Sequence, residues 1–402
     1  MDNTAAVNAS SRKFDDMEAV RGFAALGVVF YHFLHGFLPT SQVSGWNGLG
    51  RLVIVDRPVL LALINGPFMV SIFFVLSSYV LTVKLVRESD LRSAAAAIAK
   101  RFPRLLPLTI IGSVVPAILF VGGWMANEDV AAVINSSWLE RSGGVKSDPA
   151  MPPPSIVGGI LDAVELFWRG WSQYNSALWT MKYELIGSVF ALATAVAVGS
   201  VRRLKTDACV ILVIGVAGLW VHPLVSVCVV TVFLTKYVCQ PGFELPRRAI
   251  IALLVAGIVL GSTYKSLPEE LLQEDWVRTQ ALRVDWLLHG AGAMMILVAV
   301  RGWKKSPFQD NRLGRTLGRL SFPMYVLHVP VFGSVASGIF VALGYGAASF
   351  ALAFVVSITV LMVASFPLAL LDEAWVQKLN TVMKRFANRD RVPSAMAADP
   401  AP

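Results

Sequence analysis

The 402-residue sequence predicts an all-α integral membrane protein of about ten transmembrane helices, with both termini in the cytoplasm. Three observations lead to this fold class. Hydrophobic residues make up 55% of the chain and charged residues 15%, with a mean hydropathy of +0.63, whereas soluble domains are about 45–50% apolar and about 25% charged. Apolar runs recur at roughly the 17–25 residues that cross a bilayer. Basic residues are concentrated in alternate loops, as the positive-inside rule expects.

Ten apolar runs are the candidate spans. In chain order they cover 22–38, 62–83, 105–124, 178–198, 208–222, 223–240, 248–264, 284–300, 320–342 and 347–371. The fifth and sixth are short, and Pro223 stands between them, so this pair forms either a tight hairpin or one broken span. The first run carries His32 and His35 and is followed by no Ala-x-Ala pattern, so we expect a retained span rather than a cleaved signal peptide.

The net charge of +9 is explained by membrane orientation rather than by a nucleic-acid partner. With the N-terminus in the cytoplasm, Lys and Arg in the cytoplasmic loops outnumber those in the outside loops by about three to one. The opposite orientation would place the basic clusters 100–104, 202–205 and 301–319 outside. The sequence therefore predicts a multi-pass protein of the cytoplasmic (inner) cell membrane, with the lipid bilayer as its partner, no nucleic acid, and an oligomeric state left open.

The chain is expected to hold a single membrane domain. Its predicted divisions are a cytoplasmic tail at 1–13, the membrane domain at 14–375 and a basic cytoplasmic tail at 376–402. No internal repeat is visible, although inverted repeats are common in secondary transporters. The longest outside loop, 125–177, carries the aromatic residues Trp168, Trp171 and Tyr174, which are either interfacial anchors or a platform on which a sugar stacks.

The first span contains the sharpest candidates, because an ionisable group at membrane depth costs about 2.5–3.5 kcal/mol to insert. Arg21 and His32 are eleven residues apart, which is three helical turns plus roughly 20°, so both lie on one helix face about 16 Å apart along the axis. Glu18 lies one turn before Arg21 and can pair with it. Arg21 alone is also typical of a positive-inside anchor, and His32 of an interhelical hydrogen-bond partner.

Two further pairs of polar residues stand out. Arg101 and Arg104 lie one turn apart where the third span begins. Two guanidinium groups at that spacing can bind phosphate groups, although lipid headgroups or simple orientation explain the same pattern. Asp285 and His289 are four residues apart on the eighth span and can bond to one another, most simply as a structural contact. No His and carboxylate spacing is typical of a metal site, so we expect no metal.

Five segments together resemble the membrane-bound acyltransferase-3 family. They are Glu18-Ala-Val-Arg21 through to Tyr31-His32, Phe73-Phe74-Val-Leu-Ser77-Ser78-Tyr79, Arg101-Phe-Pro-Arg104 with Pro107, Leu178-Trp179-Thr-Met-Lys-Tyr-Glu184, and Leu320-Ser321-Phe-Pro-Met-Tyr325-Val-Leu-His328. Each motif is weak alone. Their order along the chain and their spread over most of it make the resemblance specific.

The resemblance implies a stand-alone O-acyltransferase without a fused extracytoplasmic domain. Such an enzyme moves a short acyl group, most often acetyl, from cytoplasmic acyl-CoA to a hydroxyl of a saccharide or similar acceptor. The sequence leaves the acceptor open among an exported polysaccharide, a lipid-linked glycan and a small natural product. It also implies that His32 is essential and that Arg101 and Arg104 bind the acyl donor. Acyl-CoA is then a substrate, and no bound cofactor is expected. The residues expected to line or brace the cavity are Ser77, Trp179, Glu184, Ser321, Tyr325 and His328.

The catalytic set is expected to be His32, Arg21 and Glu18, with His32 as general base on the acceptor hydroxyl. Direct transfer is favoured over a covalent intermediate, because no cysteine is positioned as an acyl carrier. The alternative from another class is a proton-coupled transporter or exporter, in which His32, Glu184 and Asp285 relay protons. A third hypothesis is a non-catalytic membrane scaffold.

Overall fold

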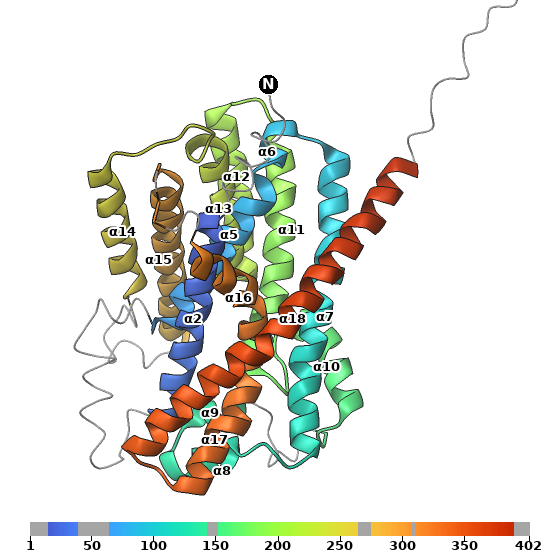
Figure 1. The fold of residues 1–402 in the computed structure, drawn as a ribbon. Helices are drawn as coiled ribbons and strands as arrows, with labels where there is room; N and C mark the ends of the chain where they lie inside the picture. The colour runs from blue at the N-terminus through green and yellow to red at the C-terminus, as the bar shows by residue number, and fades with distance from the viewer. Residues whose placement is uncertain are drawn as a thin grey trace, which may run out of the picture.

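The computed structural model describes residues 15–38, 64–142, 152–263, 275–304, 306–307 and 311–389, and within them it is a bundle of helices without strands (Figure 1). In chain order the helices are α2 (Asp15–Phe37), α5 (Gly66–Thr82), α6 (Leu85–Glu88), α7 (Leu91–Val121), α8 (Asn127–Ile134), α9 (Ser137–Ser142), α10 (Ile156–Arg169), η1 (Ser176–Trp179), α11 (Thr180–Val198), α12 (Leu204–Val221), α13 (Pro223–Phe233), η2 (Leu234–Val238), α14 (Arg247–Gly261), α15 (Asp275–Arg301), α16 (Arg312–Val331), η4 (Phe332–Ala336), α17 (Ser337–Leu343) and α18 (Ala347–Arg389).

Eight helical segments of the described residues are long and apolar enough to cross a membrane, which confirms the predicted class of all-α membrane protein. The sixth and seventh predicted spans correspond to shorter helices, Pro223–Val238 and the 15-residue α14. The number of spans and the side of each terminus stay predictions.

The fifth and sixth predicted spans form the tight hairpin rather than one broken span. His222 is the single residue between α12 and α13, and its ring Nδ1 accepts the Leu224 amide at 3.2 Å. Pro223 occupies the first turn of α13, where its missing N–H leaves no helical bond unmade. Further along the pair, Ser226 Oγ donates to the Gly215 carbonyl at 2.5 Å.

Four helices begin well before the apolar runs that predicted them. Helix α7 begins at Leu91 instead of 105, α15 at Asp275 instead of 284, α16 at Arg312 instead of 320, and α2 at Asp15 instead of 22. The first of these starts is set by Asp90, whose side chain accepts the amides of Arg92 and Ser93. Hydropathy finds only the apolar part of a helix, so the apolar runs left out the polar turns that carry Arg21 and Arg101.

Helices α2 and α16 pack against each other unusually closely, because each presents glycine to the other. A Cβ atom on Gly22 would lie 2.5 Å from Leu317 Cβ, and one on Gly318 would lie 2.6 Å from the Glu18 carbonyl oxygen. Small residues allow this approach of two backbones in a membrane protein. The two helices run parallel, with Arg21 beside Ser321 at one end and His32 beside His328 at the other.

Helix α18 runs obliquely across the bundle (Figure 1) and packs on α7 and α16. It continues without a break to Arg389, beyond the domain boundary predicted at 375. The predicted N-terminal tail and residues 390–402 of the C-terminal tail lie outside the described residues. The predicted outside loop 125–177 is itself largely helical: α8 and α9 lie with α17 at one end of the bundle, and α10 packs along α7.

Candidate active site

A cavity of about 270 Å³ lies between α2, α5, α7, α11, α16 and α18. We call it the arginine cavity, because Arg21, Arg101, Arg104 and Arg319 all line it. Eight predicted site residues line its wall: Glu18, Arg21, Ser77, Arg101, Arg104, Glu184, Ser321 and Tyr325. The remaining three, His32, Trp179 and His328, do not.

Arg21 is held by both helices of the closely packed pair. Its Nη2 donates to Glu18 Oε2 at 2.7 Å, which is the pairing predicted from the helical spacing, and to the Gly318 carbonyl at 3.1 Å. Its Nε donates to Ser321 Oγ at 3.1 Å. The guanidinium group is therefore fixed in orientation at the cavity wall, although the side chain remains 40% exposed.

Arg101 and Glu184 form a second, deeper ion pair at 2.6 Å, with side-chain exposures of 11% and 16%. Glu184 Oε1 also accepts Ser77 Oγ at 2.7 Å, and Arg101 Nε donates to Ser188 Oγ at 2.9 Å. These contacts join α7, α5 and α11. They bring together three residues that belong to three of the five segments quoted above.

Arg104 forms a bidentate ion pair with Asp372 on α18, at 2.5 and 2.8 Å. Arg319, also on the cavity wall, makes the same kind of contact with Glu373, at 2.6 and 2.9 Å. Sequence reasoning missed Asp372 and Arg319. The sequence signal for these contacts was the acidic pair Asp372 and Glu373. It directly follows the last apolar run, on the side of the membrane where the positive-inside rule expects basic residues.

His32 and His328 form a hydrogen-bonded pair, with 2.9 Å between His32 Nδ1 and His328 Nε2. His328 is fully buried, and its Nδ1 lies 2.7 Å from the Tyr325 carbonyl. A carbonyl only accepts, so Nδ1 of His328 carries the proton, and in the neutral ring Nε2 is then the acceptor. His32 must therefore donate from Nδ1, which leaves its Nε2 with a free lone pair. This arrangement is what a general base needs.

Tyr325 connects the histidine pair, His32 and His328, with the arginine cavity. It lines the cavity, lies one helical turn before His328, and holds that ring through its backbone carbonyl. Its hydroxyl donates to the Ala177 carbonyl and lies 2.7 Å from Thr180 Oγ1. Ser321, Tyr325 and His328 follow the i, i+4, i+7 spacing of one helix face. That face of α16 leads from the cavity to the histidine pair.

Trp179 packs elsewhere, in an aromatic cluster with Tyr183, His222 and Trp286, whose ring centroids lie 5.7–5.9 Å from its own. Its side chain therefore faces away from the arginine cavity. We find no position for it in the lining that the sequence predicted.

The residues of the hypothetical proton relay lie in three separate clusters. His32 bonds to His328, whereas Glu184 bonds to Arg101 and Ser77. Asp285 and His289 share no hydrogen bond: His289 Nε2 donates to the Thr263 carbonyl at 2.8 Å. Among the described residues, Asp285 Oδ1 and His289 Nδ1 find no hydrogen-bond partner.

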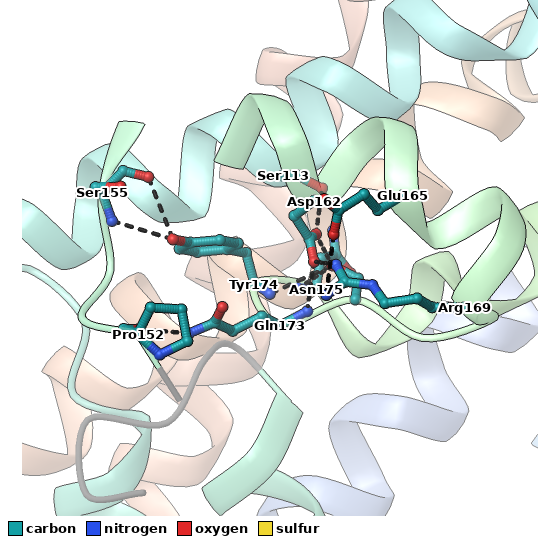
Figure 2. Close-up of polar contacts among 10 residues, drawn as sticks. Ser113, Pro152, Ser155, Asp162, Glu165, Arg169, Gln173, Tyr174 and Asn175 are labelled. Carbon is teal, nitrogen blue, oxygen red and sulfur yellow. Dashed lines mark hydrogen bonds and ion pairs between the residues drawn. The ribbon is translucent and has the colours of Figure 1, made fainter. Parts of the chain in front are cut away.

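The three aromatic residues of the outside loop do not form one surface. Tyr174 is 1% exposed, and its hydroxyl accepts the Ser155 amide and donates to the Ser155 carbonyl (Figure 2). Trp168 and Trp171 are 66% and 43% exposed. Within the described ranges, no three side chains of His, Cys, Asp or Glu gather in a way that holds a metal ion.

Eight long apolar helical segments among the described residues, and a cavity between helices that four arginines line, define a polytopic membrane protein with its candidate site between the helices. The chain belongs to the acyltransferase-3 family: the family model, described as an acyltransferase domain, matches residues 14–371. The membership predicted from five short segments is confirmed, and the protein is a membrane acyltransferase. A search of curated proteins and a search of solved structures each gave no match.

Proposed function

We propose that the protein transfers an acyl group, most simply acetyl, from acyl-CoA to a hydroxyl of a saccharide or lipid-linked glycan. The observation that carries this proposal is the histidine pair, whose hydrogen bonds leave His32 Nε2 as a proton acceptor. The pair lies on the same two helices that carry Arg21 and Ser321 into the arginine cavity.

The arginine cavity supports binding of the anionic donor. Each guanidinium group has five N–H donors, and Arg101 uses two of them on Glu184 and Ser188. The rest stay available for phosphate oxygens, which guanidinium groups bind through paired N–H donors. Arg21 stands between the donor site and the histidine, close to the path of the pantetheine arm.

The proposed reaction is direct transfer. His32 Nε2 takes the proton of the acceptor hydroxyl as its oxygen attacks the thioester carbonyl carbon. The new C–O bond forms, the C–S bond breaks, and the CoA thiolate takes the proton from His32 Nε2. While His32 is charged, its Nδ1–H bond to His328 Nε2 stabilises the imidazolium ring.

The test is acyl transfer in inside-out membrane vesicles with radiolabelled acetyl-CoA. His32→Ala should abolish transfer of label to glycan or lipid-linked material, while the protein still inserts and accumulates. His35→Ala is the matched control, because His35 lies one turn away on the same helix, is exposed, and stacks on Tyr31.

Two results would contradict the proposal. A His32→Ala variant that keeps more than a few per cent of the activity would remove the general base. Unchanged acetyl-CoA in wild-type vesicles, together with proton movement, would favour the transporter. The acceptor class is tested by mass spectrometry of surface glycans from a deletion strain, in which an acyl modification should disappear.

A further inference from the structure

Helix α16, which carries His328, and its neighbour α7 each contain a proline that leaves a carbonyl group without its helical hydrogen-bond partner. Proline has no N–H, so Pro116 in α7 and Pro330 in α16 remove the helical partner of the carbonyl four residues earlier. These carbonyls belong to Gly112 and Val326. In a membrane interior no water is present to replace the lost partner, so another protein group must supply it.

Asn175 supplies both missing partners. Its Nδ2 donates to the Gly112 carbonyl at 3.0 Å and to the Val326 carbonyl at 2.8 Å. Since the amide has two N–H groups, one side chain satisfies both helices. Asn175 is fully buried, and its Oδ1 accepts the Ala177 amide at 3.2 Å. The side chain thus ties α7 to α16.

The backbone around Asn175 is held in turn by a buried carboxylate on α10 (Figure 2). Asp162, 3% exposed, accepts the Ser172 hydroxyl at 2.5 Å, the Gln173 amide at 2.9 Å and Arg169 Nη2 at 2.9 Å. Ser172 Oγ then accepts the Asn175 amide at 3.1 Å. Asp162 also accepts a serine hydroxyl of α7, so the loop is anchored to that same helix.

The contact between Asn175 and Val326 lies next to the histidine pair. Val326 is two residues before His328, and its neighbour Tyr325 contributes the carbonyl that fixes the His328 ring. Beyond this point α16 passes through Pro330 into the wider π-helical turn η4, so its own hydrogen bonds constrain the helix weakly. Asn175 therefore helps to fix α16 where His328 bonds to His32, together with the bond from the Tyr325 hydroxyl to the Ala177 carbonyl.

We propose that Asn175 is a positioning residue for acyl transfer: by satisfying the two carbonyls that Pro116 and Pro330 leave free, it sets the place of His328 and, through it, the orientation of His32. This inference rests on the function proposed above. Asn175 touches neither the histidines nor the cavity, so its effect should be on the rate of transfer and not on donor binding.

The experiment uses the proline positions as a specific rescue. Asn175→Ala should lower kcat by roughly 10–100-fold, the size expected for a displaced catalytic group, with the KM for acetyl-CoA unchanged. Adding Pro116→Ala and Pro330→Ala restores the two backbone N–H groups, so the triple variant should recover at least half of the wild-type kcat. The two proline replacements alone should leave kcat near wild type.

Asn127→Ala is the matched control, because Asn127 is equally buried and also donates to two carbonyls, those of Leu139 and Glu140. No proline frees those carbonyls, so the proline replacements should not rescue this variant. If Asn175→Ala fails to accumulate, the triple variant alone decides: an active protein supports the proposal, and an unfolded or inactive one overturns it.

Three further outcomes overturn the inference: full activity of Asn175→Ala, rescue of Asn127→Ala, and loss of activity in the proline variant that retains Asn175. His32→Ala in the same assay separates the two proposals. If it is active, the proposed function fails; if it is inactive while Asn175→Ala is fully active, only the positioning role fails.

Discussion

The arginine cavity and the histidine pair share helices α2 and α16, but the polar groups around them differ in charge. In the cavity each arginine faces a carboxylate: Glu18, Glu184, Asp372 and Glu373 pair with Arg21, Arg101, Arg104 and Arg319. At the histidine pair, the hydrogen bonds of the described residues run from one imidazole to the other and on to a backbone carbonyl.

Under the proposed function, this difference separates donor binding from proton transfer. Fixed guanidinium groups would attract the proposed anionic donor, and their carboxylate partners would keep the charges compensated while no donor is bound. A neutral imidazole chain in an apolar place keeps a lone pair available for a proton. A carboxylate beside the histidines would instead favour the charged ring, which is a poor base.

The largest effect is expected from breaking the neutral pair. His328→Ala removes the acceptor that orients His32, so kcat should fall by roughly 100-fold with little change in the KM for acetyl-CoA. His328→Gln is the informative companion, because its amide oxygen can still accept the His32 Nδ1–H. Steady-state kinetics on the purified protein in lipid vesicles measures both. Equal loss in the two variants would contradict the orienting role.

The Arg101–Glu184 pair is expected to show the next largest effect, on stability as well as on binding. Removing one partner of a mostly buried pair leaves a charge unpaired, at a cost of about 3 kcal/mol. Glu184→Gln should lower the thermal unfolding temperature, and Arg101→Met should do so and also raise the KM for acetyl-CoA.

The double variant Arg101→Met/Glu184→Leu is the control for that pair. It should regain stability while keeping the raised KM, since it restores charge balance without restoring a guanidinium group. Recovery of both the stability and the wild-type KM would show that Arg101 has a structural role alone. Donor binding by this arginine would then be contradicted.

Arg319 is expected to act through long-range charge, with a smaller effect. Its side chain is 48% exposed, so Arg319→Gln should leave stability nearly unchanged, as for most surface ion pairs. It should raise the KM for acetyl-CoA roughly 3–10-fold at low salt, and less at high salt because of screening. Acetyl-pantetheine, which lacks the nucleotide phosphates, should not distinguish the variant from wild type. A loss with both donors would contradict phosphate binding.

The class of fold and most residues of the arginine cavity could be predicted from the sequence. Charged residues beside apolar runs are visible in a single sequence, and the helical period placed Glu18 next to Arg21 and put Arg21 on one helix face with His32. Ser321 and the other lining residues were predicted from the family resemblance. The resemblance also predicted Trp179 in the lining together with Glu184, but only Glu184 lines the cavity. Side-chain direction at the start of α11 depends on packing against α15, which no local pattern reveals.

The partners of the predicted residues were harder to find. Asp372 meets Arg104 across 268 positions of sequence, and Asn175 reaches Val326 across 151. Such contacts are set by how helices cross, and their sequence signal is indirect. Each proline inside a span does announce a free carbonyl four residues earlier, so a buried donor such as Asn175 can be expected, although its identity cannot.

The smallest effect is expected at another carbonyl that a proline leaves free, beside the arginine cavity. Pro107 frees the Pro103 carbonyl, and Trp375 Nε1 of α18 donates to it at 2.8 Å. Trp375 and Pro103 are both half-exposed, unlike Asn175, so water can replace the indole. Trp375→Phe should cost about 1 kcal/mol of stability or less, and kcat should stay near wild type in the vesicle assay. The contradicting result is a loss of kcat as large as that of Asn175→Ala. Burial would then not explain why one carbonyl freed by proline needs its side-chain partner more than the other does.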